Sequence, residues 1–411
     1  MNSRIALRVF FLFALGYFLS NLFRGLNVGF APYLIQEMNL SAGDLGLLTS
    51  FYFIGFAVFQ LPAGLALDRW GARRTHAALL LVAALGGVVY AFSQDIYGLI
   101  AGRFLIGMGI AVGYAGALMI LSQTSPMSRL PMLAGLIVAF GGMGGVMVGT
   151  PLNISLQYFD WPTITLIVAG TTALLALAIY FTIPEVHPKS DTHISFKEQY
   201  QGIKQIFKTP SFWRLVSLPS ATGGVFYAAQ SLWVRPFMSD VLGYSVEQMA
   251  SMVSMLGLAM VAGTTLTGLA ARKLEAYGIN LHLFSGIGFL SFLLVQLLII
   301  LQVPLPAWML WVGYGFAGSS WTLAFAYSAE IFPRHIMGRV TTSFNTVFFA
   351  CIFSTQIAIG YILDFWPKVS ETAYPVQAHI TAWTIFLVIQ GLAAIVYLWP
   401  KPLTIDAQRF T

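Results

Sequence analysis

Twelve apolar stretches, each about 20 residues or more, follow one another along this chain. A helix needs about 20 apolar residues to cross the hydrocarbon core of a bilayer. In lipid the backbone must satisfy its hydrogen bonds within the protein, so stretches of this length predict helices. The expected spans are residues 9–37, 43–67, 76–93, 97–122, 131–155, 162–183, 212–240, 246–270, 279–302, 307–329, 340–364 and 379–399.

The composition agrees with a chain that lives in lipid. Hydrophobic residues make up 58% of the chain and charged residues only 9%, whereas a soluble domain has about 25% charged residues. The mean hydropathy is +0.78. A water-soluble globule is therefore excluded, and we expect an all-α polytopic membrane protein with twelve transmembrane helices.

One long polar segment, residues 184–211, separates the first six stretches from the last six. When the second half is laid on the first, matching residues recur at one constant offset: Pro32 with Pro236, Ser41 with Ser245, Ser50 with Ser254, and Gly64 with Gly268. Internal symmetry of this kind is typical of membrane proteins built from repeated halves. We expect two pseudo-symmetric six-helix bundles, residues 1–183 and 212–411, joined by a linker at 184–211.

Charge predicts the orientation. Nearly all lysines and arginines outside the spans lie on the side of the two termini, and Lys368 is the one expected on the other side. Because cytoplasmic loops are enriched in Lys and Arg, both termini are expected in the cytoplasm, in a bacterial inner membrane. The net charge of +6 then reflects topology and needs no nucleic acid as a partner.

Ionisable residues other than arginine avoid the middle of the expected spans. All fifteen acidic residues and all six histidines are expected in loops or near helix ends. No cluster of nucleophilic, acid–base or metal-ligating residues is expected at membrane depth, so the sequence predicts no enzyme, no metal site and no cofactor.

The strongest local motif lies in the turn after the second span. It runs Gly64-Leu-Ala-Leu-Asp68-Arg69-Trp-Gly71-Ala-Arg73-Arg74 and resembles the G-x-x-x-D-R-x-G-R-R signature of the major facilitator superfamily. A second resemblance, Arg103-Phe-Leu-Ile-Gly107-Met-Gly109, matches an element of the fourth helix. The resemblance implies a secondary transporter that works by rocker-switch alternating access, with Asp68 as part of a latch for its outward-facing state. The expected gating residues here are Gly64, Asp68, Arg69, Gly71, Arg73 and Arg74.

The first span carries a polar row on an otherwise apolar helix. Tyr17, Ser20, Asn21, Arg24 and Asn27 recur at steps of three and four, which places them on one face. An unpaired arginine at bilayer depth costs at least about 2.5 kcal/mol. The row therefore predicts a hydrated cavity that holds the guanidinium, and Tyr17, Asn21, Arg24 and Asn27 are candidate substrate-binding residues.

Other candidates lie on the helices that the resemblance places around a central cavity. The further substrate-binding candidates are Tyr114, Tyr227, Gln230 and Trp321, with Gln60 and Asn345 as additional candidates. Arg103 and Arg235 lie nearer the helix ends and are expected to act in gating or to extend toward the membrane surface. Asp240 or Glu37 is the expected ion-pair partner of Arg235.

Three membrane arginines without a membrane carboxylate indicate an anionic solute, because the guanidinium fork matches carboxylate and phosphate oxygens. Arg24, followed by Pro32-Tyr33-Leu34, resembles anion:cation symporters and organophosphate antiporters. We expect a monomer that moves a small organic anion, with either a proton or a counter-anion as the coupled ion. Two alternatives stay open: efflux of amphipathic compounds, and a transporter-like sensor without flux.

Overall fold

The computed structural model describes residues 3–124, 130–184, 196–277, 280–333 and 336–400. Within these ranges the chain is helical and has no strand. The helices are α1 (Ser3–Met38), α2 (Ala42–Ala91), α3 (Ile96–Gly109), α4 (Gly113–Thr124), α5 (Leu130–Val146), α6 (Thr150–Ser155), α7 (Trp161–Thr182), α8 (Phe196–Phe207), α9 (Pro210–Ala228), a π-helical turn (Ala229–Trp233), α10 (Val234–Asp240), α11 (Val246–Ala276), α12 (Leu281–Ile300), α13 (Ala307–Gly318), α14 (Trp321–Ile331), α15 (Met337–Leu363) and α16 (Val376–Tyr397).

The twelve expected spans are confirmed, although several of them bend. Nine helices in the described residues are long and apolar enough to cross a membrane. Three more spans are each broken into shorter helices: α5 with α6, α9 with α10 across the π-helical turn, and α13 with α14. The helix α2 supplies two spans, because Gly71 turns the chain with a φ of 77°, a conformation that glycine adopts without a steric penalty.

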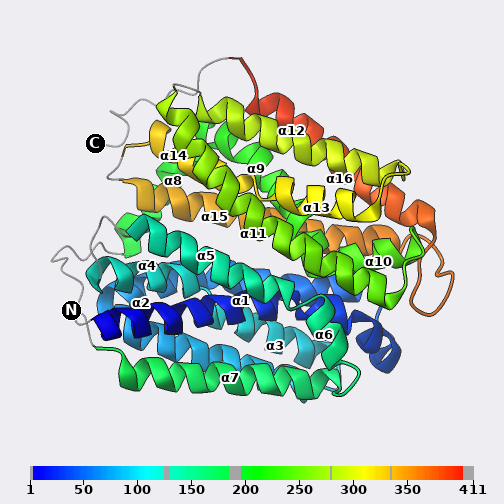
Figure 1. The fold of residues 1–411 in the computed structure, drawn as a ribbon, viewed down its shortest axis with the longest axis horizontal. Helices are drawn as coiled ribbons and strands as arrows, with labels where there is room; N and C mark the ends of the chain where they lie inside the picture. Colours follow the sequence, from blue (N-terminus) through cyan, green and yellow to red (C-terminus); the bar gives the residue numbers. More distant parts are fainter. Residues whose placement is uncertain (1–2, 125–129, 185–195, 278–279, 334–335, 401–411) are drawn as a thin grey trace.

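The helices form two groups that lie one above the other in Figure 1, with α1–α7 in the lower group and α9–α16 in the upper group. The short helix α8 packs on α15, where Gly202 lies against the Arg339 side chain. Both termini lie at the same end of the molecule (Figure 1), which we call the terminal end; the opposite end is the far end. The division of the chain into domains at residues 184–211 stays a prediction.

Two antiparallel helix pairs join the groups. In the first pair, α2 and α15, Ser50 Oγ lies 3.1 Å from the carbonyl oxygen of Phe353. In the second pair, α5 and α11 with α6 beside them, the N–H of Thr150 donates to Ser254 Oγ over 2.8 Å. Glycine allows the close approach, because a Cβ on Gly149 would lie 2.2 Å from Ser254 Oγ.

The same helix pairs separate toward the terminal end. A Cβ added to Gly64 on α2, to Gly135 on α5 or to Gly268 on α11 would meet no atom within 4 Å. Gly64 and Gly268 are the two positions that the internal repeat superposes. The groups therefore touch at the far end and diverge at the terminal end, in the same manner in both pairs.

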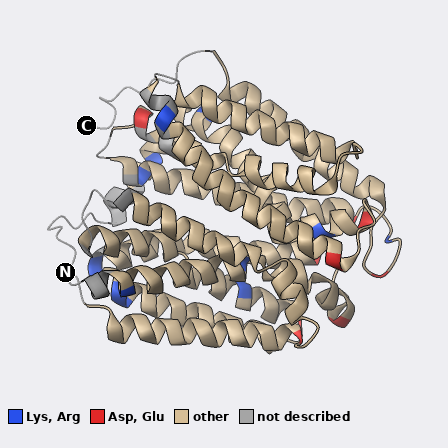
Figure 2. Ribbon diagram, viewed as in Figure 1, with Lys and Arg blue, Asp and Glu red and all other residues tan. Residues whose placement is uncertain are grey.

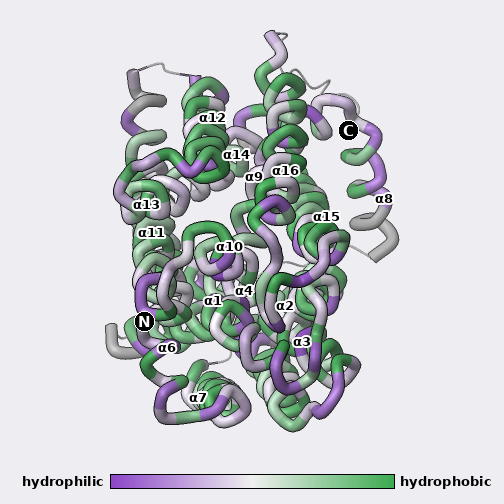
Figure 3. The backbone as a smooth tube through the Cα atoms, turned by 90° about the vertical axis from the view of Figure 1, so that its right-hand side faces the viewer, coloured by the Kyte–Doolittle hydropathy of each residue, from purple (hydrophilic) through white to green (hydrophobic). Residues whose placement is uncertain are grey.

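The outer surface of the bundle is apolar. On α12 large side chains stand exposed at helical spacing, from 38% to 58% of their area: Leu283, Ile287, Leu290, Leu294 and Leu297. Figure 3, which looks along the helices, shows hydrophobic segments around the outside of the two groups. A contiguous apolar face of this kind is typical of contact with lipid.

Charges gather at the two ends of the helices. Figure 2 shows most described lysines and arginines at the terminal end and most acidic residues at the far end. Several acidic residues cap helices there: Asp44 and Ser41 form a reciprocal capping box on α2, and Asp160 accepts the N–H of Thr163. The hydrogen bonds from Thr163 lower the pKa of the Asp160 carboxyl, as expected for a helix N-terminus.

Candidate functional site

Arg24 lies between the two groups of helices. Its Nη2 donates to Asn21 Oδ1 over 2.5 Å, one turn earlier on α1, which fixes the direction of the guanidinium. The guanidinium carbon lies 4.6 Å from the centroid of the Tyr227 ring on α9, a cation–π contact between the groups. Among the described residues no carboxylate forms an ion pair with Arg24.

A cavity of about 90 Å³ opens beside Arg24 and is lined from both groups of helices. Eight of its twelve lining residues are aromatic, and Arg24 is the only charged residue among the described lining residues. The predicted candidates that the structure brings to this cavity are Tyr17, Arg24, Tyr227, Trp321 and Asn345. The Trp321 indole N–H is buried and has no hydrogen-bond partner in the described part of the chain.

A second, smaller pocket lies on the other side of Arg24. It has room for about one water molecule, and its lining includes Asn21, Arg24 and Gln230. Gln230 Nε2 lies 3.4 Å from the sulfur of Met260, whereas its Oε1 is buried without a partner among the described residues. Arg24 thus stands where the two pockets meet.

Two further predicted residues, Tyr114 and Gln60, lie next to residues of the cavity wall. The Tyr114 ring packs on Tyr17, with ring centroids 5.6 Å apart, but Tyr114 does not itself line the cavity and is 37% exposed. Asn345 Nδ2 donates to Gln60 Oε1 over 3.3 Å. This bond ties α2 to α15 at the edge of the cavity.

Asn27 does not reach either pocket. Its Nδ2 donates to Thr49 Oγ1 over 2.8 Å, and its Oδ1 accepts the hydroxyl of Tyr90 over 2.8 Å. The side chain is fully buried. Its amide therefore connects α1 with the two halves of α2, although it continues the polar row that the sequence shows.

Arg103 is buried inside the first group of helices. Its Nη1 donates to the carbonyl oxygen of Phe23 over 2.7 Å, and the guanidinium lies over the Tyr90 ring at 5.0 Å. The backbone oxygen and the aromatic face take the place of an acidic partner for this cation. Arg103 lines neither of the two pockets.

The expected ion pair of Arg235 with Asp240 or Glu37 is wrong. Asp240 Oδ2 accepts from His379 Nε2 over 2.9 Å and from the Tyr374 N–H over 3.0 Å. Glu37 accepts the indole N–H of Trp161 over 2.9 Å. Both carboxylates are thus engaged by other donors, and Arg235 Nε and Nη2 have no partner in the described residues.

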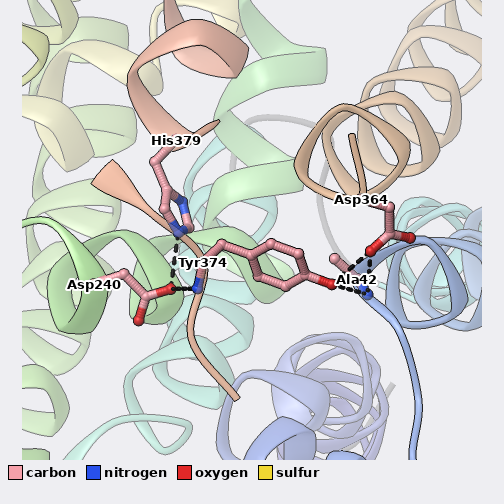
Figure 4. Close-up of polar contacts among 5 residues, drawn as sticks. All are labelled: Ala42, Asp240, Asp364, Tyr374 and His379. Carbon is pink, nitrogen blue, oxygen red and sulfur yellow. Dashed lines mark hydrogen bonds and ion pairs between the residues drawn. The ribbon is translucent and has the colours of Figure 1, made fainter. Parts of the chain in front are cut away.

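At the far end a hydrogen-bonded network connects the two groups of helices (Figure 4). The Asp364 carboxylate, at the end of α15, accepts the backbone N–H of Ala42 over 3.1 Å and that of Gly43 over 2.7 Å. The Tyr374 hydroxyl donates to the same carboxylate, and its own N–H binds Asp240. An anion is thus held at the N-terminus of α2, where the helix dipole favours it.

The network at the far end was not predicted. It depends on pairs hundreds of residues apart in the sequence, and no local pattern marks them. The sequence also predicts every histidine in a loop or near a helix end, and His76 lies in the first turns after the bend of α2 at Gly71. This side chain is fully buried within a span, stacks on Phe13 with ring centroids 4.8 Å apart, and has both ring nitrogens without a partner among the described residues.

The motif after the second span forms the bend of α2 at the terminal end. Arg73 lies over the Tyr180 ring at 5.4 Å and donates to the Ile183 carbonyl oxygen over 3.3 Å. Arg69 lies over Trp70 at 5.6 Å, and Arg74 is exposed. The Asp68 side chain lies outside the described part of the chain, so the latch stays a prediction.

Comparison with known families agrees with this architecture. The family described as Major Facilitator Superfamily matches residues 13–355, and the chain belongs to it. A solved bacterial homologue of the human lysosomal transporter Spinster, in an inward-facing and unoccupied conformation, has the same fold. It superposes with a TM-score of 0.74 at 17% identity and covers 97% of both chains.

Several relatives are named for the solutes that they transport. The probable sulfoacetate transporter of Cupriavidus necator is 22% identical over 62% of this chain and 62% of its own length. The cis,cis-muconate transport protein of Acinetobacter baylyi is 24% identical over 80% of this chain and 81% of its own length. The family match and the names of these relatives point to a transporter rather than an enzyme.

Proposed function

We propose that this transporter moves a small organic anion and that Arg24 is the counter-ion of that anion. The observation that carries the proposal is a guanidinium at a cavity between the two helix groups, with no carboxylate partner among the described residues. An arginine in this position costs free energy until something negative binds it. The names of the relatives, which include sulfoacetate and muconate, support an organic anion.

We propose alternating access between two arrangements of the helix groups. The far end is closed by the Asp364 network and the terminal end is open at Gly64, Gly135 and Gly268. With both termini in the cytoplasm of a bacterial cell, as the distribution of Lys and Arg favours, this arrangement is the inward-facing state. In the opposite state the far-end contacts separate and the terminal end closes.

The coupled ion has two candidates, a proton and a counter-anion. No acidic residue lines the cavity in the described part of the chain. A proton site needs a buried group that can gain and lose a proton. His76 is the candidate, because it is buried and has no hydrogen-bond partner among those residues. Uptake measured with and without a pH gradient separates symport from exchange.

The decisive experiment compares Arg24→Ala and Arg24→Lys with the native protein in proteoliposomes. Radiolabelled mono- and dicarboxylates and a sulfonate are measured by counterflow. Arg24→Ala is expected to lower the flux about 100-fold or more, because two charge-assisted hydrogen bonds are lost. Arg24→Lys is expected to keep a small part of it, since the charge stays and the fork is lost.

The matched control removes a cation elsewhere. Lys204→Ala, on the exposed side of α8, is expected to transport at the native rate. Native flux in Arg24→Ala would refute the role of Arg24 as counter-ion. Absence of saturable flux for every anion in the native protein would favour a sensor without transport.

The aromatic cavity lining favours one alternative, the efflux of amphipathic compounds. Such compounds bind aromatic surfaces without a fixed counter-ion. The two functions differ in their dependence on Arg24. A neutral aromatic solute that is transported equally well by Arg24→Ala would establish efflux in place of anion transport.

A further inference from the structure

Resting on the proposed anion transport, we infer the class of anion: a monoanion with a flat aromatic body, rather than a polyhydroxylated acid or a dianion. The basis is the chemistry of the cavity wall beside Arg24. The cavity offers one cation, several aromatic faces and some scattered polar groups. Each of these three properties constrains a different part of the solute.

The single cation limits the charge of the solute. Among the described lining residues, Arg24 alone is charged. Arg103 is engaged inside the first helix group, and Arg235 does not line the cavity. A second carboxylate on the solute would therefore lose its hydration, and no second cation in the cavity would compensate for that loss. Burying an unpaired charge is strongly unfavourable.

The aromatic side chains define the shape of the body. Trp321 and Phe348 have ring centroids 5.0 Å apart, and Tyr227 packs against both, at 6.0 Å and 5.9 Å. Phe349 packs edge-on against Phe348, with ring centroids 5.9 Å apart, and continues the cluster to Phe56 at 4.4 Å. A planar ring laid on this continuous aromatic surface would meet aromatic faces and edges, which attract it beyond the burial of its area.

Some polar groups of the wall are engaged within the protein, and others are free to bind a solute. Tyr52 donates its hydroxyl to the Ser20 carbonyl oxygen over 3.0 Å, and the Asn345 amide nitrogen donates to Gln60. The Trp321 indole N–H has no partner among the described residues, so the wall can bind a single polar substituent. A sugar acid has no ring face to lay on the aromatic side chains that make up most of the lining, so the wall favours an aromatic body over a polyol.

Arg24 also sets the place of the charged group. Its guanidinium lies at the edge of the aromatic cluster, over Tyr227 at 4.6 Å, and Asn21 holds its Nη2. An anionic group bound to the free edge of the fork would direct the attached ring toward Trp321 and Phe348. The cavity of about 90 Å³ favours a body of one ring.

Binding to the purified protein in detergent tests this inference, because neutral aromatic acids cross liposome membranes unaided. Equilibrium dialysis is performed with benzoate, terephthalate, tartrate and benzamide. Benzoate is expected to bind at least about tenfold more tightly than tartrate or terephthalate. Benzamide, which has the ring without the charge, is expected to bind weakly.

The variant Phe348→Leu separates recognition of the ring from general damage. It is expected to weaken benzoate binding about tenfold while acetate binding stays unchanged, since acetate uses Arg24 alone. A structural defect would weaken both equally. Phe289→Leu, in the core of the second helix group away from the cavity, is the matched control and is expected to bind benzoate normally.

The outcomes distinguish the two levels of the proposal. Binding of tartrate or terephthalate more tightly than benzoate, abolished by Arg24→Ala, would overturn the aromatic monoanion and leave anion transport intact. Equal binding of benzamide and benzoate, unaffected by Arg24→Ala, would overturn both. Loss of benzoate and acetate binding together in Phe348→Leu, with normal Phe289→Leu, would also refute selection by the ring.

Discussion

At the scale of single residues, the position of Arg24 depends on a neighbour on its own helix. Asn21 accepts from the guanidinium at 2.5 Å, and without that bond the long side chain regains rotamer freedom. Asn21→Ala should raise the KM for a transported anion about tenfold, since a hydrogen bond to a charged group contributes about 1.5–3 kcal/mol. The maximal rate should change little.

Initial-rate counterflow over a range of anion concentrations measures this effect. Thr171→Ala is the control and should leave the KM near the native value, because its exposed hydroxyl on α7 donates to the Ile167 carbonyl oxygen of its own helix. A fall in the maximal rate with an unchanged KM would show that Asn21 acts on the conformational change instead of on Arg24.

The sequence predicts a residue's position on its helix better than its partners. The row from Tyr17 to Asn27 marks one polar face, and it correctly leads to the cavity at Tyr17 and Arg24. It fails for Asn27, whose partners Thr49 and Tyr90 lie on another helix. Helical periodicity specifies the face but contains no information on what packs against it.

At the scale of helices, the N-terminus of α2 and the end of α15 form the main polar contact at the far end. Asp364→Asn keeps the size of the side chain and removes the charge that accepts from Ala42 and Gly43. The far-end contact should weaken, and the ratio of open to closed far ends should rise roughly tenfold. Burial raises the pKa of Tyr374, so its hydroxyl stays protonated at neutral pH and can still donate to the amide oxygen of the variant.

Spin labels at Tyr158 and Val369, two exposed far-end positions in different helix groups, report the opening as a distance distribution. The native Cys351 is replaced by serine beforehand. Asp95→Asn, whose carboxylate caps its own helix through Gly98, is the control and should leave the distribution unchanged. An unchanged distribution in Asp364→Asn would show that apolar packing alone holds the far end closed.

The bends of these helices could be predicted only in part. Gly71 stands out in the sequence because Arg69, Arg73 and Arg74 flank it, and its positive φ fits the expected turn. The π-helical turn at Ala229–Trp233 has no glycine or proline to announce it. Its extra residue is accommodated by packing against α1, a contact between sequence-distant helices.

At the scale of the whole molecule, the two helix groups meet along two seams, formed by the pair α2 and α15 and by the pair α5 and α11. Each seam is closed by close backbone contact at the far end. Gly149→Val should prevent this closure, because a Cβ there would lie 2.5 Å from the Ala250 carbonyl oxygen. Gly64→Val has open space in the described state and should interfere only when the terminal end closes. The two variants should therefore accumulate opposite states, and both should lose flux.

The same pair of spin labels tests this expectation. Gly149→Val should lengthen the Tyr158–Val369 distance, and Gly64→Val should give the native short distance with less spread. Gly170→Val is the control for folding. Its added atoms also meet open space, but α7 is not part of a seam. A short distance in Gly149→Val would contradict the idea that this seam must part.

The sequence alone was sufficient for the number of spans and their repeat, because lipid imposes length and apolarity on every one of them. The arrangement of the two seams, closed at Gly149 and open at Gly64, could not be read from it. Both glycines occur in similar small-residue contexts, and only the three-dimensional arrangement distinguishes the end that is shut.

The solitary charge of Arg24 has a consequence for the response to membrane voltage. Under the proposed binding of a monoanion, the empty cavity carries one positive charge and the loaded cavity carries none. An inside-negative potential then acts on the empty carrier and favours the inward-facing arrangement, by up to about 2.3 kcal/mol per 100 mV if the charge crossed the whole field. The loaded carrier changes conformation almost independently of voltage. During import, the voltage-dependent step is therefore the return of the empty protein from the inward-facing to the outward-facing state.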